Sequence, residues 1–229
     1  MKKLINTTLA VLATATLSLS SMAASSGVAL DAANTDINDR NSLQRGAKLF
    51  MNYCSGCHSI EFMRYNRLGQ DLGLTDEQVV DNLMFTGEKV GDPITSSISA
   101  DASAKWFGAT PPDLSLVARS RGLDWIYTYL RSFYADESRS FGVNNHVLQN
   151  ASMPDVLWKL KAEKSEKEFD QDVRDITNFL DYVAEPVKLI RYDLGYKVLG
   201  FLFILFILAY LMKKEYWKDV KYGKWRAKD

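Results

Sequence analysis

Two apolar runs stand near the ends of the chain, and shorter amphipathic segments lie between them. The first run covers residues 4–19, follows Lys2 and Lys3, and is rich in alanine, leucine and threonine. Small residues at positions 21 and 23 complete the pattern of a secretory signal sequence. We therefore expect residues 1–23 to be a signal peptide that exports the rest of the chain; a retained N-terminal anchor is the alternative.

The second apolar run, residues 195–212, carries a single charged side chain, that of Lys197. A helix that rises about 1.5 Å per residue would extend this run to roughly 27 Å, close to the hydrocarbon thickness of a bilayer. Apolar side chains would cover every face, which argues against the alternative of a buried core helix. We predict a transmembrane helix over residues 192–213 and, because basic residues favour the inner side of the membrane, a cytoplasmic tail over residues 214–229.

Residues 24–191, which we predict to form one periplasmic domain, contain several segments with helical periodicity. The apolar positions of its first helix recur at intervals of four, three and four residues. They are Leu43, Ala47, Phe50 and Cys54. Asn41 or Ser42 is expected to cap this helix.

Two other segments show helical signals of their own. Residues 75–85 begin with a capping box formed by Thr75 and Gln78, followed by apolar positions at helical spacing. Residues 167–184 place their apolar side chains on one side, which predicts the last helix of the exported domain.

The segment between these helices is less regular. Residues 91–110 lack a clear period and are expected to form an irregular loop that ends at Pro111 and Pro112. Residues 113–134 are expected to be helical in two pieces, separated at Gly122. Strand signals are weak throughout the chain. The pattern therefore predicts an all-α domain with one C-terminal transmembrane helix.

The charge balance adds to this topology. The chain has 28 basic and 28 acidic residues, and a neutral chain argues against a nucleic-acid partner. The neutrality is the sum of unequal parts, because residues 213–229 carry seven basic and three acidic side chains while residues 1–23 carry two basic ones. The body between them is at −6, so the exported domain is expected to be acidic and the tail basic.

The two cysteines of the chain, Cys54 and Cys57, are followed directly by His58. This C-x-x-C-H pattern is the attachment signature of c-type haem, in which two thiols bind the vinyl groups and the histidine binds the iron. A zinc site would need two further ligands, and His146 is the one remaining histidine. A dithiol redox site would favour a βαβ setting. We predict one covalent haem c (heme c), with a dithiol or metal site as the alternative.

The sixth iron ligand separates electron transfer from ligand binding. Met153 is the expected ligand, because Pro154 stiffens an irregular stretch whose other residues are small. His146 and an open iron position are the alternatives. A histidine and methionine pair favours high-potential electron transfer, whereas an open position favours peroxidase chemistry or gas binding.

Two arginines follow the Pro-Pro turn. Arg119 and Arg121 carry forked donors that suit the haem propionates, and Trp125 lies one helical turn beyond Arg121. The alternative is that both arginines are solvated on an exposed helix.

Several short motifs together resemble the cytochrome c1 family of respiratory bc1 complexes. They are Arg45-Gly46, residues 54–59 (CSGCHS), residues 111–115 (PPDLS) running into 118–121 (ARSR), Met153-Pro154 with 156–158 (VLW), and 184–186 (AEP). The resemblance extends from about Arg40 to the C-terminus. It implies a class I cytochrome c-like fold enlarged by loops, in which Gly46 lets the first helix pack closely across the last one near Leu180.

The resemblance also implies roles for individual residues. His58 and Met153 would be the axial ligands of the iron, Pro111 and Pro112 would line the haem, and Arg121 would lie near a propionate. One departure is the Trp106-Phe107-Gly108 segment, where many relatives have Asn-Asn-Gly. The stretch between Tyr134 and Met153 is also short for the family.

The function implied by the resemblance is electron transfer within a bacterial inner membrane. The chain would take electrons from a Rieske iron-sulfur protein and pass them to a soluble or membrane-bound cytochrome c. Its other partners would be cytochrome b and membrane lipid, in a dimeric complex. Alone it would be an electron carrier, and it would be part of an enzyme only as a subunit of ubiquinol:cytochrome c oxidoreductase.

Three alternatives remain at this point. The chain could be a membrane-anchored c-type cytochrome of another respiratory complex, a haem enzyme or gas sensor with an open iron position, or a haem-free dithiol protein.

Overall fold

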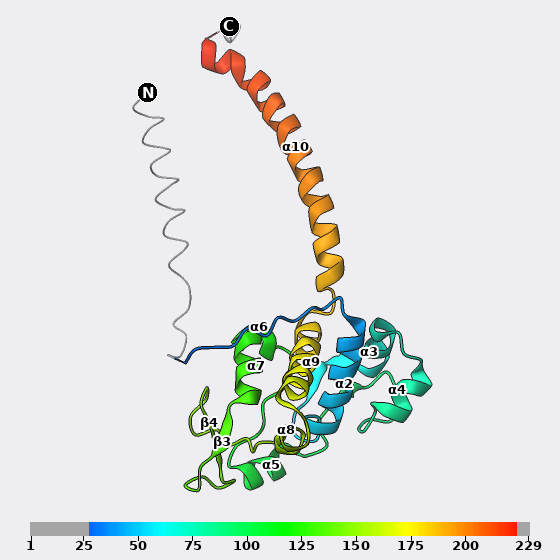
Figure 1. Cartoon of the computed structure of the whole chain (residues 1–229). Helices are drawn as coiled ribbons and strands as arrows, with labels where there is room; N and C mark the ends of the chain where they lie inside the picture. The colour runs from blue at the N-terminus through cyan, green and yellow to red at the C-terminus, as the bar shows by residue number, and fades with distance from the viewer. Residues whose placement is uncertain (1–27, 224–229) are drawn as a thin grey trace.

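Helices α2 (Arg40–Tyr53) and α9 (Glu166–Ala184) cross at the centre of the globular part of the molecule (Figure 1). The computed structural model describes residues 28–223. The predicted apolar face of α2, from Leu43 to Cys54, is buried, which confirms that helix. The rings of Phe50 and Phe179 meet at the crossing with their centroids 5.5 Å apart. This crossing is the core from which the rest of the domain extends.

Gly46 allows the two helices to approach closely. A Cβ atom built at this position would lie 2.0 Å from the backbone oxygen of Asp175 and 2.7 Å from the Cβ of Phe179. Real Cβ atoms essentially never come so close to another atom. The close packing expected near Leu180 is thus found against Asp175 and Phe179.

A buried carboxylate joins the same two helices. Asp175 is fully buried, and it accepts hydrogen bonds from Ser42 Oγ (2.6 Å) and Arg45 Nε (2.6 Å). The cap of α2 is Asp39 rather than the expected Asn41 or Ser42, because the Asp39 carboxylate accepts from the backbone N–H of Ser42. The hydroxyl of Ser42 is used instead to bind Asp175.

The segment after α2 folds into short elements beside it. They are β1 (Ile60–Arg64), α3 (Tyr65–Leu72), α4 (Asp76–Asn82) and β2 (Pro93–Ile94). The capping box of Thr75 and Gln78 at the start of α4 is confirmed. Strand β1 pairs with β2 in antiparallel fashion, so that Ile60 lies opposite Ile94 and both are buried.

The prediction of an irregular loop over residues 91–110 was wrong. Besides β2, this segment contains α5 (Ala100–Phe107), which begins at the Ser99 cap and ends at Gly108 in the left-handed region. Ser103 is the one buried side chain of α5. A short helix that buries so little has no apolar stripe, which is why periodicity did not indicate it.

The next segment confirms the break at Gly122 but shortens the helices. Helix α6 (Val117–Arg121) and helix α7 (Leu123–Arg131) meet there. The last predicted helical residues instead form β3 (Phe133–Ala135), which pairs in antiparallel fashion with β4 (Val143–Asn145). Helix α8 (Trp158–Glu163) then leads to α9, whose capping box is formed by Ser165 and Glu168. The described part is mostly helical, which confirms the predicted fold class.

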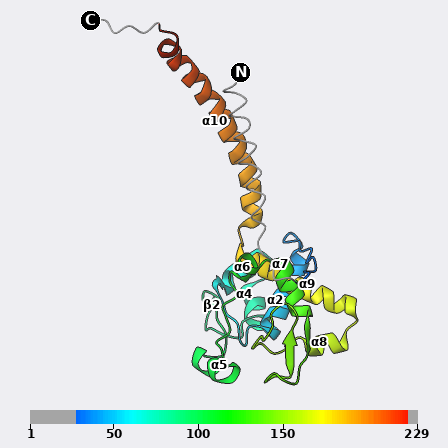
Figure 2. The ribbon, with the colours of Figure 1, turned by 90° about the vertical axis from the view of Figure 1, so that its left-hand side faces the viewer.

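Helix α10 (Lys188–Tyr222) projects from the globular part as one long rod (Figures 1 and 2). It holds the one candidate membrane span among residues 28–223, over Ile190–Tyr222, and the large apolar side chains of that span are exposed. This agrees with a single-pass anchor. The helix is longer than the predicted span of 192–213, which stays a prediction, and the signal peptide over residues 1–23 lies outside the described residues.

Candidate functional site

The C-x-x-C-H motif lies in a tight turn at the end of α2. The backbone N–H groups of Cys57 and His58 both donate to the carbonyl of Cys54, at 3.0 and 2.8 Å. Both thiols are free, that of Cys54 buried and that of Cys57 partly exposed. The turn therefore places two thiols and one imidazole within a single turn of the chain.

The imidazole of His58 is held in one tautomer. Its Nδ1 lies 2.8 Å from the backbone oxygen of Pro112, and a carbonyl can only accept, so Nδ1 carries the proton. Burial lowers the pKa of His58, against the opposing effects of the Pro112 carbonyl and Asp113. A neutral ring protonated at Nδ1 presents the Nε2 lone pair, which is the form that ligates metals.

The Pro-Pro segment is tied to the chain that follows the motif. The backbone N–H of Leu114 donates to the carbonyl of Ser59 at 2.8 Å, and the carboxylate of Asp113 accepts from the N–H of Glu61 at 2.9 Å. Pro111 is partly buried and Pro112 is exposed. These bonds fix the carbonyl of Pro112 against His58, so Pro112 joins the site through its backbone.

A ladder of side chains on α6 and α7 connects Arg121 to Met153. The guanidinium carbon of Arg121 lies 5.3 Å from the ring centroid of Trp125, and Trp125 stacks on Tyr129 at 4.9 Å. The hydroxyl of Tyr129 then donates to the sulfur of Met153, 3.5 Å away. Three of the predicted site residues are thus linked by Tyr129, which the sequence analysis did not select. The spacing of four residues between Trp125 and Tyr129, on one face of α7, was the available signal.

Tyr129 is a stable hydrogen-bond donor. Its ring also meets Phe133 edge to face at 5.2 Å, and burial raises its pKa to about 12. The hydroxyl therefore keeps its proton at neutral pH.

Two asparagines shape the loop that carries Met153. Asn145 is fully buried; its Oδ1 accepts from the N–H of Val147 at 2.8 Å, and its Nδ2 donates to the carbonyl of Tyr129 at 2.8 Å. Asn144 Oδ1 accepts from the N–H of Asn150 at 2.9 Å, and Asn150 has a positive φ of 63°. Sequence analysis missed both, although adjacent asparagines are typical of turns that bond their own backbone.

The other candidates have surface positions. The His146 side chain is exposed and stacks on Tyr134 with ring centroids 4.3 Å apart. Arg119 is exposed on α6, and Arg121 is exposed apart from its contact with Trp125. His146, Arg119 and Arg121 thus lie at the surface, whereas Met153 is partly buried against Tyr129.

The sequence profile described as the cytochrome C1 family matches residues 32–220, which is most of the chain. The chain belongs to the cytochrome c1 family. It is 47% identical to cytochrome c1 of Allochromatium vinosum, over 96% of this chain and 100% of that protein. It is 41% identical to the ammonia monooxygenase gamma subunit of Nitrosomonas europaea, over 84% and 89% of the two chains. It is 25% identical to cytochrome b/c1 of Bradyrhizobium diazoefficiens, over 79% of this chain and 34% of that one.

Cytochrome c1 proteins bind haem c, and the donors found here suit that group. Cys54 and Cys57 offer two free thiols one turn apart, His58 offers a neutral imidazole nitrogen, and Met153 offers a thioether. Arg121 can supply a fork of donors for a carboxylate. The residues therefore fit the family's cofactor.

The Trp106-Phe107-Gly108 segment ends helix α5. Trp106 is 70% exposed at the end of α5, and the ring of Phe107 packs against Phe141 at 5.8 Å. These aromatic rings border a cavity of about 150 Å³ that Arg139 and Ser152 also line. An aromatic contact thus joins the end of α5 to the loop between β3 and β4 that carries Phe141.

Proposed function

We propose that this chain is the haem c subunit of a bc1 complex, which takes single electrons from a Rieske iron-sulfur protein and passes them to a cytochrome c. The observation that carries the proposal is the turn that holds Cys54, Cys57 and His58. In it, His58 Nδ1 donates a hydrogen bond to the backbone oxygen of Pro112 at 2.8 Å. This arrangement leaves one metal-binding nitrogen next to two free thiols. The cytochrome b/c1 relative supports cytochrome b as a partner.

The proposed roles follow from the chemistry of each side chain. Cys54 and Cys57 would hold the single haem c through thioether bonds, and His58 Nε2 and Met153 Sδ would bind its iron. When bound, haem c supplies a one-electron couple between ferric and ferrous iron. A thioether ligand opposite an imidazole raises the potential of that couple, which suits a late step of a respiratory chain.

Further proposed contacts lie around these ligands. Pro111 and Pro112 line the group, Pro112 also orienting His58 through its carbonyl. Arg121 binds a propionate, and Trp125 holds Arg121 by the cation–π contact at 5.3 Å. On this proposal these residues orient His58 and neutralise the charge of a propionate, and they do not exchange electrons themselves. Alone, the protein is a carrier, and it catalyses quinol oxidation only as part of the complex.

The proposed topology places the domain over residues 24–191 in the periplasm of a bacterial inner membrane. The signal-sequence pattern of residues 1–23 and the basic residues over 214–229 support this direction. The net charge of −6 on the exported body favours a basic cytochrome c as the acceptor, because opposite charges speed the encounter of the partners. We also propose that the complex is dimeric.

One competing function has an observation in its favour. The Nitrosomonas europaea relative is named as a subunit of ammonia monooxygenase, so a related chain carries the name of a different membrane complex. On that alternative the haem site would be unchanged and the partners would differ. Co-purification without cytochrome b would favour it.

The proposal is tested by rapid mixing of the purified complex with a quinol, following the c-type absorbance. Reduction of haem c is expected in the complex that contains the Rieske protein and is expected to be lost when that protein is extracted. Equal reduction rates with and without the Rieske protein would contradict the proposed electron donor. Carbon monoxide binding to the native ferrous protein would contradict Met153 as a ligand and favour an open iron position.

A further inference from the structure

Tyr129 is the residue that joins the Met153 loop to the rigid part of the domain. Its backbone carbonyl accepts from Asn145 Nδ2 at 2.8 Å, and its hydroxyl donates to Met153 Sδ at 3.5 Å. One residue of α7 thus contacts both the base of the loop and the sulfur at its end.

The Tyr129 ring cannot easily move away from this position. The residue is 8% exposed, and its ring is held between Trp125, stacked at 4.9 Å, and Phe133, at 5.2 Å. Trp125 comes from the preceding turn of α7, and Phe133 is the first residue of strand β3, which follows the helix. The position of the hydroxyl oxygen is therefore fixed, and it donates to the sulfur of Met153 at 3.5 Å.

The loop is braced from the other side as well. Asn145 Oδ1 accepts from the N–H groups of Val147 and Leu148, at 2.8 and 3.2 Å. Arg139 donates to the carbonyl of Asn150 at 3.0 Å. These bonds fix the backbone leading to Met153, so that the sulfur position depends on few free torsions.

We propose that Tyr129, anchored by Asn145, is a positioning residue that holds the sulfur of Met153 and sets the reduction potential of the haem. This inference rests on the proposed function, in which Met153 is an axial ligand. A hydrogen bond to the thioether withdraws electron density from the sulfur, and ferric iron needs that density more than ferrous iron does. The bond therefore favours the reduced state, as hydrogen bonds to ligand atoms do in other metal sites.

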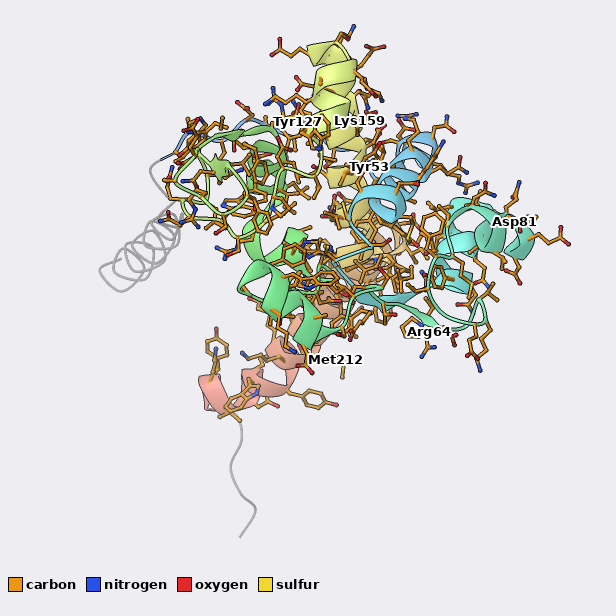
Figure 3. The ribbon with its side chains drawn as sticks, turned by 90° about the horizontal axis from the view of Figure 1, so that it is seen from below. Tyr53, Arg64, Asp81, Tyr127, Lys159 and Met212 are labelled. Atoms are coloured by element: carbon orange, nitrogen blue, oxygen red, sulfur yellow. The ribbon has the colours of Figure 1, made fainter. Side chains whose placement is uncertain are left out.

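The test compares Tyr129→Phe with a matched control, Tyr127→Phe, in the purified membrane complex. Tyr127 is also a buried tyrosine of α7, but its hydroxyl meets Arg174 of α9 at 3.3 Å (Figure 3 labels Tyr127). Both variants lose one hydroxyl from the same helix. Only Tyr129→Phe removes the bond to Met153.

The main measurement is an optical redox titration of the c-type band. One hydrogen bond of ordinary strength corresponds to a two- to tenfold change in the ratio of reduced to oxidised haem, since such bonds are worth about 0.5–1.5 kcal/mol. At about 59 mV per factor of ten for a one-electron couple, the potential of Tyr129→Phe should fall by about 20 to 60 mV. Tyr127→Phe should match the wild type.

A second variant tests the anchor. Asn145→Asp keeps the Oδ1 acceptor for the loop and removes the Nδ2 donor to the Tyr129 carbonyl. We expect a larger fraction of ferrous protein to bind carbon monoxide, because the sulfur is held less firmly. If this variant fails to fold, Tyr129→Phe still decides the proposal.

The outcomes separate this inference from the proposed function. The ferric wild type should show the sulfur-to-iron charge-transfer band in the far red; without that band Met153 is not a ligand, and both the ligand assignment made under the proposed function and the positioning role of Tyr129 fail. With the band present, an unchanged potential in Tyr129→Phe, or an equal fall in Tyr127→Phe, would overturn the positioning role alone.

Discussion

Gly46→Ala tests how closely α2 and α9 pack, because there is no space for a methyl group at their crossing. The added Cβ would lie 2.0 Å from the Asp175 carbonyl oxygen and 2.7 Å from Phe179 Cβ. Both atoms belong to the interior face of α9 and cannot turn away as the end of a flexible side chain could. The helices must therefore separate by about 1 Å before the nearest contact reaches the 3.0 Å lower limit.

The cost follows from the size of that separation. Forcing an extra carbon into a packed core costs about 1–3 kcal/mol, and a gap of about 0.5–1 Å loses a quarter to a half of the dispersion energy between facing atoms. In the opposite direction, alanine in a helix is more stable than glycine by about 0.5–1 kcal/mol, because the unfolded chain has less conformational entropy to lose. We expect a net loss of about 2 kcal/mol in the free energy of unfolding, which lowers Tm by roughly 4–8 °C for a domain of this size.

The assay is thermal unfolding of the full chain in detergent, followed by circular dichroism. Gly91→Ala is the control, because a Cβ atom there meets no atom within 4 Å. A Tm for Gly46→Ala equal to that of Gly91→Ala would refute the close crossing. That result would also contradict the view that the close packing of α2 against α9 fixes the position of Cys54.

Three other predictions address the site, the loop and the surface. Cys57→Ser should leave a single thioether bond through Cys54, so the amount of haem retained after denaturing electrophoresis should fall; unchanged haem staining would count against attachment at Cys57. Hydrogen bonds from Ser138 and Asn144 hold the pKa of Asp136 below its ordinary value, so its stabilising effect is complete above about pH 4 and disappears as the pH falls through the lowered pKa. Asp136→Ala should therefore be less stable than the wild type in chemical unfolding at about pH 7, the difference should shrink as the pH falls below about 4, and a constant difference would refute this. Turnover with a basic cytochrome c should slow as salt screens the acidic body, and a rate independent of ionic strength would contradict electrostatic steering.

The sequence predicted the parts of the fold in which burial repeats with the helical period. Residues 43–54 and 167–184 each place apolar side chains on one face, and they became α2 and α9 with the expected faces buried. The capping box of Thr75 and the break at Gly122 were also found. In each case a local rule of geometry was enough.

The parts that sequence analysis missed depend on contacts between distant residues. Helix α5 buries only Ser103, and strand β3 gains its partner from β4 eight or more residues away, so neither has a period that marks it. The same holds in the site. The C-x-x-C-H motif can be recognised in the sequence alone. The hydrogen bond from Tyr129 to Met153, in contrast, joins residues 24 positions apart and forms only in the folded chain.

The central claim is that this chain binds haem c and works in one complex with cytochrome b and a Rieske protein. The most direct measurement is a reduced-minus-oxidised spectrum of the complex purified through this chain from membranes, taken together with its subunit composition. The account predicts a c-type band beside b-type bands, with cytochrome b and the Rieske protein present. A c-type band in a preparation that lacks cytochrome b would contradict it.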